Sequence, residues 1–142
     1  MERRAFLSRI AAMAFVAGGG WRRGHWRWDD TLGAAGPRRH PDPRPGITAA
    51  RVVADRALDE PDDEVRVAYA AAREVPTIFD GLACVCSCTE TAHHRSLLAC
   101  FETRHPESCP GCLDEAALVG RLARQGRGLD EVRRAVDLAF GR

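Results

Sequence analysis

The chain has 142 residues and a formal net charge of +1. This length suits one small domain with flanking segments. The near-neutral charge gives no basis for the strongly basic surface of a nucleic-acid-binding protein, so no nucleic-acid partner is expected. Aromatic residues, which are enriched in strands, make up only 6% of the sequence. The composition therefore favours small helices over a sheet sandwich.

The N-terminal segment resembles a twin-arginine export signal. The positions that match its pattern are Arg3, Arg4, Phe6 and Leu7. The apolar run over residues 10–20 is shorter than the roughly 20 residues that span a bilayer, and it suits the hydrophobic region of a signal peptide. We therefore interpret residues 1–35 as a leader that uses the twin-arginine export machinery, which carries folded proteins. The expected location is the periplasm or the extracytoplasmic face of the membrane.

The sequence at the end of this leader does not decide whether the leader is cleaved. Cleavage near Ala34 and Ala35 and retention of the leader are both compatible with the sequence. Residues 21–28 are basic and aromatic, a composition that would allow contact with a membrane surface.

Prolines and glycines are concentrated over residues 36–46, which predicts an extended linker. The folded domain is expected over residues 47–142. Thr48 suits the N-cap of a short first helix over residues 49–58.

Apolar residues recur at helical spacing in the rest of the chain. The expected helices cover residues 61–75, 96–104, 109–125 and 129–140. Pro76 ends the first of these, and Gly126 and Gly128 end the third. No segment shows the alternation of a strand. The predicted fold is therefore an all-α helical domain with its cysteines in loops and at helix ends.

Six cysteines lie within the 29 residues from the first to the last of them, and the preceding part of the chain has none. They are Cys84, Cys86, Cys88, Cys100, Cys109 and Cys112. Disulfide frameworks spread their cysteines to close long loops. These six cysteines are instead clustered, as the ligands of a small metal centre would be. The first three cysteines must lie on a curled loop to reach one centre. The Cys-x-x-Cys pair, Cys109 and Cys112, has the spacing typical of two ligands that bind the same metal ion.

Histidines extend this donor set, because imidazole is a common ligand for thiophilic metals. The predicted metal ligands are Cys84, Cys86, Cys88, His94, Cys100, His105, Cys109 and Cys112. His93 is not included, and His25 and His40 are interpreted as bystanders outside the core. The donors suffice for two mononuclear sites or one polynuclear thiolate cluster that holds zinc or Cu(I).

The run from Leu82 to Cys112 resembles the uncharacterised PCYCGC-motif, or CYCXC, (seleno)protein family of exported bacterial proteins. The matching positions are Cys84-Val85-Cys86-Ser87-Cys88, His94-Arg95-Ser96, Cys100-Phe101, His105 and Cys109-Pro110-Gly111-Cys112-Leu113. Val85 departs from the family's usual aromatic residue, and His93 stands where glycine is common. Some members carry selenocysteine in the triplet, which implies redox chemistry as an alternative.

Three functions remain open at this point. The first is an exported protein that binds zinc or copper. The second is a thiol–disulfide oxidoreductase or thiol-transfer protein, although no thioredoxin-like βαβ pattern surrounds either motif. The third is a binding module stapled by disulfides. No catalytic residue, organic cofactor site or protein partner is identified, and whether the chain is an enzyme stays open.

Overall fold

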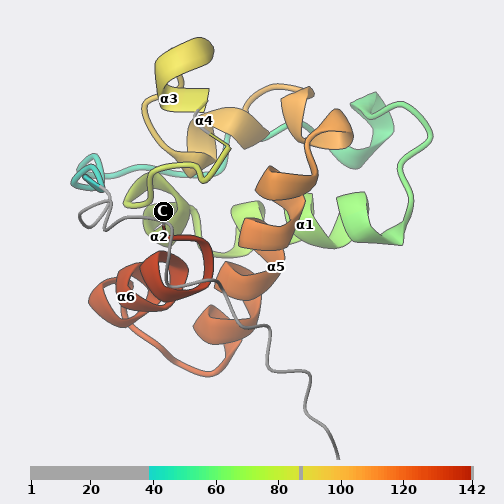
Figure 1. Ribbon diagram of the computed structural model, residues 1–142. Helices are drawn as coiled ribbons and strands as arrows, with labels where there is room; N and C mark the ends of the chain where they lie inside the picture. Colours follow the sequence, from blue (N-terminus) through green and yellow to red (C-terminus); the bar gives the residue numbers. More distant parts are fainter. Residues whose placement is uncertain (1–38, 87, 142) are drawn as a thin grey trace, which may run out of the picture. The chain divides into compact units, whose positions relative to one another are not determined.

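Helices and connecting loops make up the described part of the chain, residues 39–86 and 88–141, in the computed structural model (Figure 1). In chain order the helices are η1 (Asp55–Ala57), α1 (Asp63–Glu74), α2 (Pro76–Asp80), α3 (Cys88–Thr91), α4 (Leu97–Phe101), η2 (His105–Ser108), α5 (Pro110–Arg124) and α6 (Leu129–Phe140), where η denotes a 3₁₀-helix. These residues contain no strand, which confirms the predicted all-α fold. None of the described helices combines the length and apolar character needed to cross a membrane. The leader predicted over residues 1–35 lies outside the described residues.

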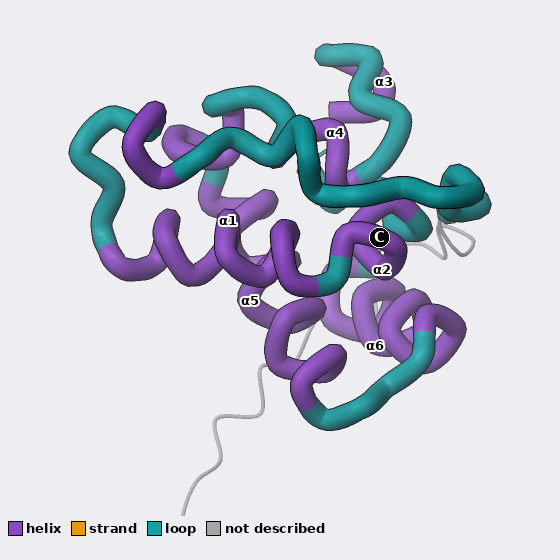
Figure 2. Tube along the Cα trace, turned by 180° about the vertical axis from the view of Figure 1, so that it is seen from behind, coloured by secondary structure: helices purple, strands orange, loops and turns teal. Residues whose placement is uncertain are grey.

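The most extensive helix contact joins α1 and α5, which pack against each other (Figure 2). Asp62 starts α1, because its side chain accepts a hydrogen bond from the backbone N–H of Val65 at 2.9 Å. Gly120 of α5 faces Ala71 of α1 so closely that an added Cβ would lie 2.8 Å from the Cβ of Ala71. The absence of a side chain at Gly120 therefore sets the spacing of the two helices.

Three aromatic rings attach α4 to α1 and α2. Phe101 of α4 makes edge-to-face contacts with Tyr69 of α1 and Phe79 of α2, with ring centroids 4.9 and 5.5 Å apart. The Tyr69 hydroxyl also donates a hydrogen bond to the carbonyl of Thr103 at 2.7 Å. These contacts hold α4, and with it Cys100, at a defined position in the core.

A Schellman turn ends α5 and leads into α6. Gly126 adopts a φ of +78°, and its N–H bonds to the carbonyl of Ala123 at 2.8 Å. The N–H of Arg127 bonds to the carbonyl of Leu122 at 3.1 Å. Glu131 then caps α6 by accepting a hydrogen bond from the N–H of Gly128 at 3.2 Å. The predicted end of α5 at Gly126 and Gly128 is confirmed.

The helix predicted over residues 49–58 is wrong. Only the short η1 and turns occur there, because the backbone N–H of Val53 donates instead to the carbonyl of Phe101 at 3.0 Å. Pro76 ends α1 as predicted, but it also occupies the first turn of α2, a helix that the sequence did not predict. Proline suits that position because the first N–H groups of a helix have no partner within it.

The carboxylate of Asp80, at the end of α2, is completely buried and holds several segments together. Arg44 donates to it from its guanidinium and from its backbone N–H, both at 2.8 Å. The Nη1 atom of Arg95 lies 3.1 Å from it, and the hydroxyl of Ser96 donates to it at 2.9 Å. The predicted linker, as far as residues 39–46 show it, is thus non-helical but attached to the helices.

Candidate metal centre

The cysteine triplet begins on a loop that is anchored at several backbone positions. The N–H of Val85 donates to the buried Oε2 atom of Glu115 in α5 at 2.8 Å. The carbonyl of Leu82 accepts a hydrogen bond from the N–H of Leu97 at 2.7 Å, at the start of α4. The Cα atoms of Cys86 and Cys88 are 5.5 Å apart, closer than the roughly 6.6 Å of an extended strand. The chain therefore curls at the triplet, as the sequence predicted.

The Cys-x-x-Cys pair occupies the start of α5. Cys109 is the N-cap residue, and Cys112 lies in the first turn, where it is fully buried. Gly111 between them faces the triplet loop: an added Cβ would lie 3.4 Å from the Cβ of Cys86 and 3.6 Å from the Cγ2 of Val85. The glycine therefore allows the helix start to approach the loop closely.

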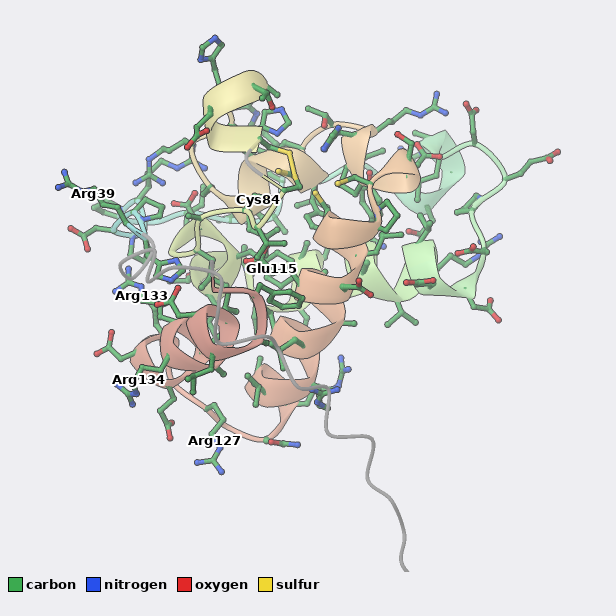
Figure 3. All side chains as sticks on the ribbon, in the orientation of Figure 1. Arg39, Cys84, Glu115, Arg127, Arg133 and Arg134 are labelled. Atoms are coloured by element: carbon green, nitrogen blue, oxygen red, sulfur yellow. A yellow bond between two sulfur atoms is a disulfide. The ribbon has the colours of Figure 1, made fainter. Side chains whose placement is uncertain are left out.

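Sulfur atoms from separate segments meet between this loop and α5. The Sγ of Cys84 is 3.1 Å from that of Cys86 and 3.4 Å from that of Cys112. The Sγ atoms of Cys86 and Cys112 are 3.5 Å apart. Figure 3 labels Cys84 and Glu115, which come from the triplet loop and α5. Cys84, Cys88, Cys100 and Cys112 are at most 2% exposed, so the sulfur cluster is largely enclosed by protein.

Two groups of four donors in this cluster can hold a metal ion. Group one consists of Cys84, Cys88, Cys100 and Cys112, all buried, and group two consists of Cys86, Cys88, His105 and Cys112. Within each group the ligand atoms lie within 4.8 Å of one another. Around zinc with Zn–S bonds of about 2.3 Å, tetrahedral ligands would be roughly 3.8 Å apart. The spacing suits four-coordinate binding.

The two predicted histidine ligands differ in position. The Nε2 of His105 is 2.9 Å from the Sγ of Cys88 and belongs to group two. The Nδ1 of His94 is 3.2 Å from the Sγ of Cys100, but His94 belongs to neither group, and the same holds for Cys109. The structure thus brings six of the eight predicted ligands into these groups, and a ligand role for His94 and Cys109 stays a prediction.

A disulfide joins Cys86 and Cys88 in the structure, and the other four cysteines form none. The same two sulfur atoms also belong to the donor groups. A sulfur in a disulfide supplies no thiolate, and the thiolate is the metal ligand. Metal binding by these two residues therefore requires the reduced state, in which both are thiolates.

The three buried cysteines outside the disulfide, Cys84, Cys100 and Cys112, differ in the direction in which their thiol pKa is shifted. Hydrogen bonds from the Cys100 and Cys112 thiols lower the pKa of Cys84 to about 3, against the opposing effect of burial. Hydrogen bonds to Cys100 and Cys84, together with burial, raise the pKa of Cys112. For Cys100, the hydrogen bond with Cys112 acts to lower the pKa, but the bond to Cys84 and burial raise it overall. The hydrogen bonds therefore favour the thiolate form of Cys84 and the thiol forms of Cys100 and Cys112.

The sequence did not identify two residues that support the site. From its position, Glu115 is expected only to be an acidic residue at the positive end of a helix, but its carboxylate is fully buried against the triplet loop. His40, interpreted as a bystander, belongs to neither donor group, but it contacts the triplet loop, because its Nδ1 accepts a hydrogen bond from the N–H of Ala83 at 3.1 Å, and its Nε2 lies 3.2 Å from the carboxylate of Asp137. The apolar face of α5, on which Glu115 lies beside Cys112 and Ala116, is the signal that could have revealed its burial.

Comparisons with known proteins agree with the resemblance of the cysteine motifs. A family model described as a protein of unknown function with PCYCGC motif matches residues 45–142. No curated protein and no solved structure matches this chain. The matched range covers more than half of the sequence and includes all six cysteines and both predicted histidine ligands. The chain belongs to the PCYCGC-motif family.

Proposed function

We propose that this protein binds zinc or copper through its cysteine cluster and is exported with the metal bound. One observation carries the metal-binding proposal: donors from segments remote in sequence form two groups of four, and the ligand atoms within each group lie within 4.8 Å of one another. Exposed acidic clusters occur often without metals, whereas the thiols of group one are buried and come from the cysteine triplet, α4 and α5. A bound cation would offset the repulsion among their negative charges.

The donor chemistry limits the choice of metal. Thiolate sulfur and imidazole nitrogen are the ligands that zinc and Cu(I) prefer, whereas calcium and magnesium require oxygen. Group one contains only sulfur, and group two contains three sulfurs and one imidazole. Both compositions are typical of structural zinc sites, which bind through four protein ligands. The cluster therefore serves metal storage, delivery or structural stabilisation, with no open ligand position for catalysis.

Export of the folded protein would explain how thiolates reach an oxidising compartment. The supporting observation is the match of Arg3, Arg4, Phe6 and Leu7 to the twin-arginine pattern. A metal bound in the reducing cytoplasm would protect Cys86 and Cys88 from forming their disulfide before transport. Replacement of Arg3 and Arg4 by lysine in the full chain is expected to retain the protein in the cytoplasm. Unchanged export of that variant, measured by cell fractionation, would contradict this part of the proposal.

A second candidate, thiol–disulfide exchange, is favoured by the Cys86–Cys88 disulfide. A dithiol substrate would attack the half-buried Sγ of Cys86 and release the Cys88 thiolate, which lies 2.9 Å from the Nε2 of His105. The second thiolate of the substrate would then displace Cys86, so that the substrate becomes a disulfide and both cysteines become reduced. The third alternative, a module stapled by three disulfides, has no such support, because the six cysteines form one disulfide.

Elemental analysis with thiol counting separates these functions. The full chain would be produced in a reducing cytoplasm and purified without air or chelator. Zinc or copper bound at one or more equivalents, with thiols that react only after the metal is removed, is the expected result. Metal-free protein that exchanges the Cys86–Cys88 disulfide with a dithiol would overturn the metal proposal in favour of redox chemistry.

A further inference from the structure

The two donor groups share two sulfur atoms, those of Cys88 and Cys112. A thiolate sulfur has several lone pairs and can bind two metal ions, whereas the nitrogen of an imidazole can bind one. We propose that the reduced cluster holds two metal ions, with the thiolates of Cys88 and Cys112 as bridges between them. This inference rests on the proposed metal-binding function and adds the number of ions and the role of each ligand.

Each bridging sulfur lies next to ligands of both groups. The Sγ of Cys112 is 3.4 Å from that of Cys84, which belongs to group one alone, and 3.5 Å from that of Cys86, which belongs to group two alone. The Sγ of Cys88 is 2.9 Å from the Nε2 of His105 and within 4.8 Å of the sulfurs of group one. Each ion thus receives two bridging thiolates and two ligands of its own.

Charge favours two divalent ions over one ion or over two Cu(I) ions. The five cysteines of the two groups carry five negative charges as thiolates. Two divalent ions leave one negative charge, whereas a single divalent ion or two Cu(I) ions leave three. Cys84, Cys100 and Cys112 are at most 1% exposed, and burying net charge is costly. Zinc is therefore the metal that matches the site.

The two ions differ in their access to solvent. All four ligands of group one are buried, but Cys86 and His105 of group two are half-buried. The ion in group two is therefore the outer one, and a chelator is expected to remove it first. The Cys86–Cys88 disulfide would displace this outer ion, because it takes one of its own ligands and one bridge, and it would also remove one ligand from the inner ion.

Metal stoichiometry of the full chain and matched variants tests the bridging arrangement. The reduced protein is expected to bind about two equivalents of zinc. Cys100→Ser removes a ligand of group one alone, and Cys86→Ser removes a ligand of group two alone, so each is expected to retain about one equivalent. Cys112→Ser is expected to lose both ions. Cys109→Ser keeps every donor of both groups, so the two-ion centre built from these groups predicts unchanged zinc binding, whereas the ligand role that the sequence predicts for Cys109 would lower it.

A spectroscopic test needs no variant and so does not depend on the folding of Cys112→Ser. Cobalt(II) would replace zinc, and the electron paramagnetic resonance signal would be followed as cobalt is added. A thiolate bridge couples the spins of the two ions, so the signal per cobalt is expected to fall as the second ion binds. Far-ultraviolet circular dichroism would verify that each variant keeps its helices.

The outcomes separate this inference from the function on which it rests. A folded, reduced chain without metal would overturn both. A chain that saturates at one zinc would retain the metal-binding function and overturn the two-ion centre. Two cobalt ions without spin coupling, together with one retained zinc in Cys112→Ser, would show separate sites and overturn the bridges. Loss of zinc in Cys109→Ser would also overturn this ligand assignment in favour of a larger ligand set.

Discussion

The buried carboxylate of Glu115 accepts a hydrogen bond from the backbone N–H of Val85 at 2.8 Å. This bond joins the first turns of α5 to the residue between Cys84 and Cys86. It therefore couples the folding of a helix to the position of the sulfur atoms.

Glu115→Ala is expected to destabilise the fold by about 3 kcal/mol, because it leaves the N–H of Val85 buried without its acceptor and opens space in the core. Urea unfolding would measure the loss. Glu115→Gln keeps an acceptor oxygen and is the control, expected to lose much less. Equal stability of Glu115→Ala and the unchanged chain would refute the anchoring role of this carboxylate.

The Asp80 network predicts a loss of stability in acid. Burial acts to raise the pKa of Asp80, but the hydrogen bonds from Arg44 and Ser96 prevail and lower it. A carboxylate with a depressed folded-state pKa stabilises the fold above its unfolded pKa of about 4, and this contribution is lost as the pH falls through the folded value. The free energy of unfolding would be measured from roughly pH 6 to roughly pH 2, a range that brackets both pKa values of Asp80, and it is expected to fall as the pH falls.

Asp80→Asn removes the titrating group and is expected to cost about 3 kcal/mol near neutral pH, because Arg44 and Arg95 lose a buried charged partner. Its stability is also expected to fall less steeply in acid than that of the unchanged chain. Asp130→Asn, at an exposed ion pair with Arg133, is the control and is expected to change stability by less than about 0.5 kcal/mol. An unchanged acid profile in Asp80→Asn would contradict the assignment.

The contact between Gly120 and Ala71 predicts sensitivity to one methyl group. Gly120→Ala would place two Cβ atoms 2.8 Å apart, and such overpacking is expected to cost about 2 kcal/mol. Thermal unfolding of a double-mutant cycle provides the measurement. Ala71→Gly removes the opposing Cβ, so the double variant is expected to be more stable than the sum of the two single changes predicts. Additive effects would show that the two helices do not meet at this point.

Oxidation is expected to release zinc through a defined pair of thiols. A mild thiol oxidant would form the Cys86–Cys88 disulfide, remove ligands from the cluster and free metal, which a chromogenic zinc chelator would detect. A reductant with added zinc is expected to restore the bound state. Cys86→Ser cannot form this disulfide, so the zinc that it retains should be released more slowly. Equal release from both proteins would mean that another pair of thiols oxidises first.

Local features of the sequence were sufficient to predict three of the main helices. Pro76 after α1, the glycines after α5 and the apolar spacing of α6 act over one or two turns, so two helix ends and a buried face follow from neighbouring residues. The density of the cysteines is equally local, and by itself it indicates a thiophilic cluster. The metal-binding chemistry is therefore a prediction that rests on residue types and their spacing alone.

Tertiary contacts decided what local spacing could not. Val53 leaves its predicted helix because its N–H meets the carbonyl of Phe101, which is distant in sequence. Cys109 and Cys112 form one motif, yet only Cys112 joins the donor groups, because Cys112 is buried in the first turn of α5 whereas Cys109 is half-buried at the N-cap. The burial of Glu115 likewise depends on the loop that packs over it. The sequence by itself determined three of the main helices and the donor inventory, whereas the packing of remote segments decided which donors share a centre.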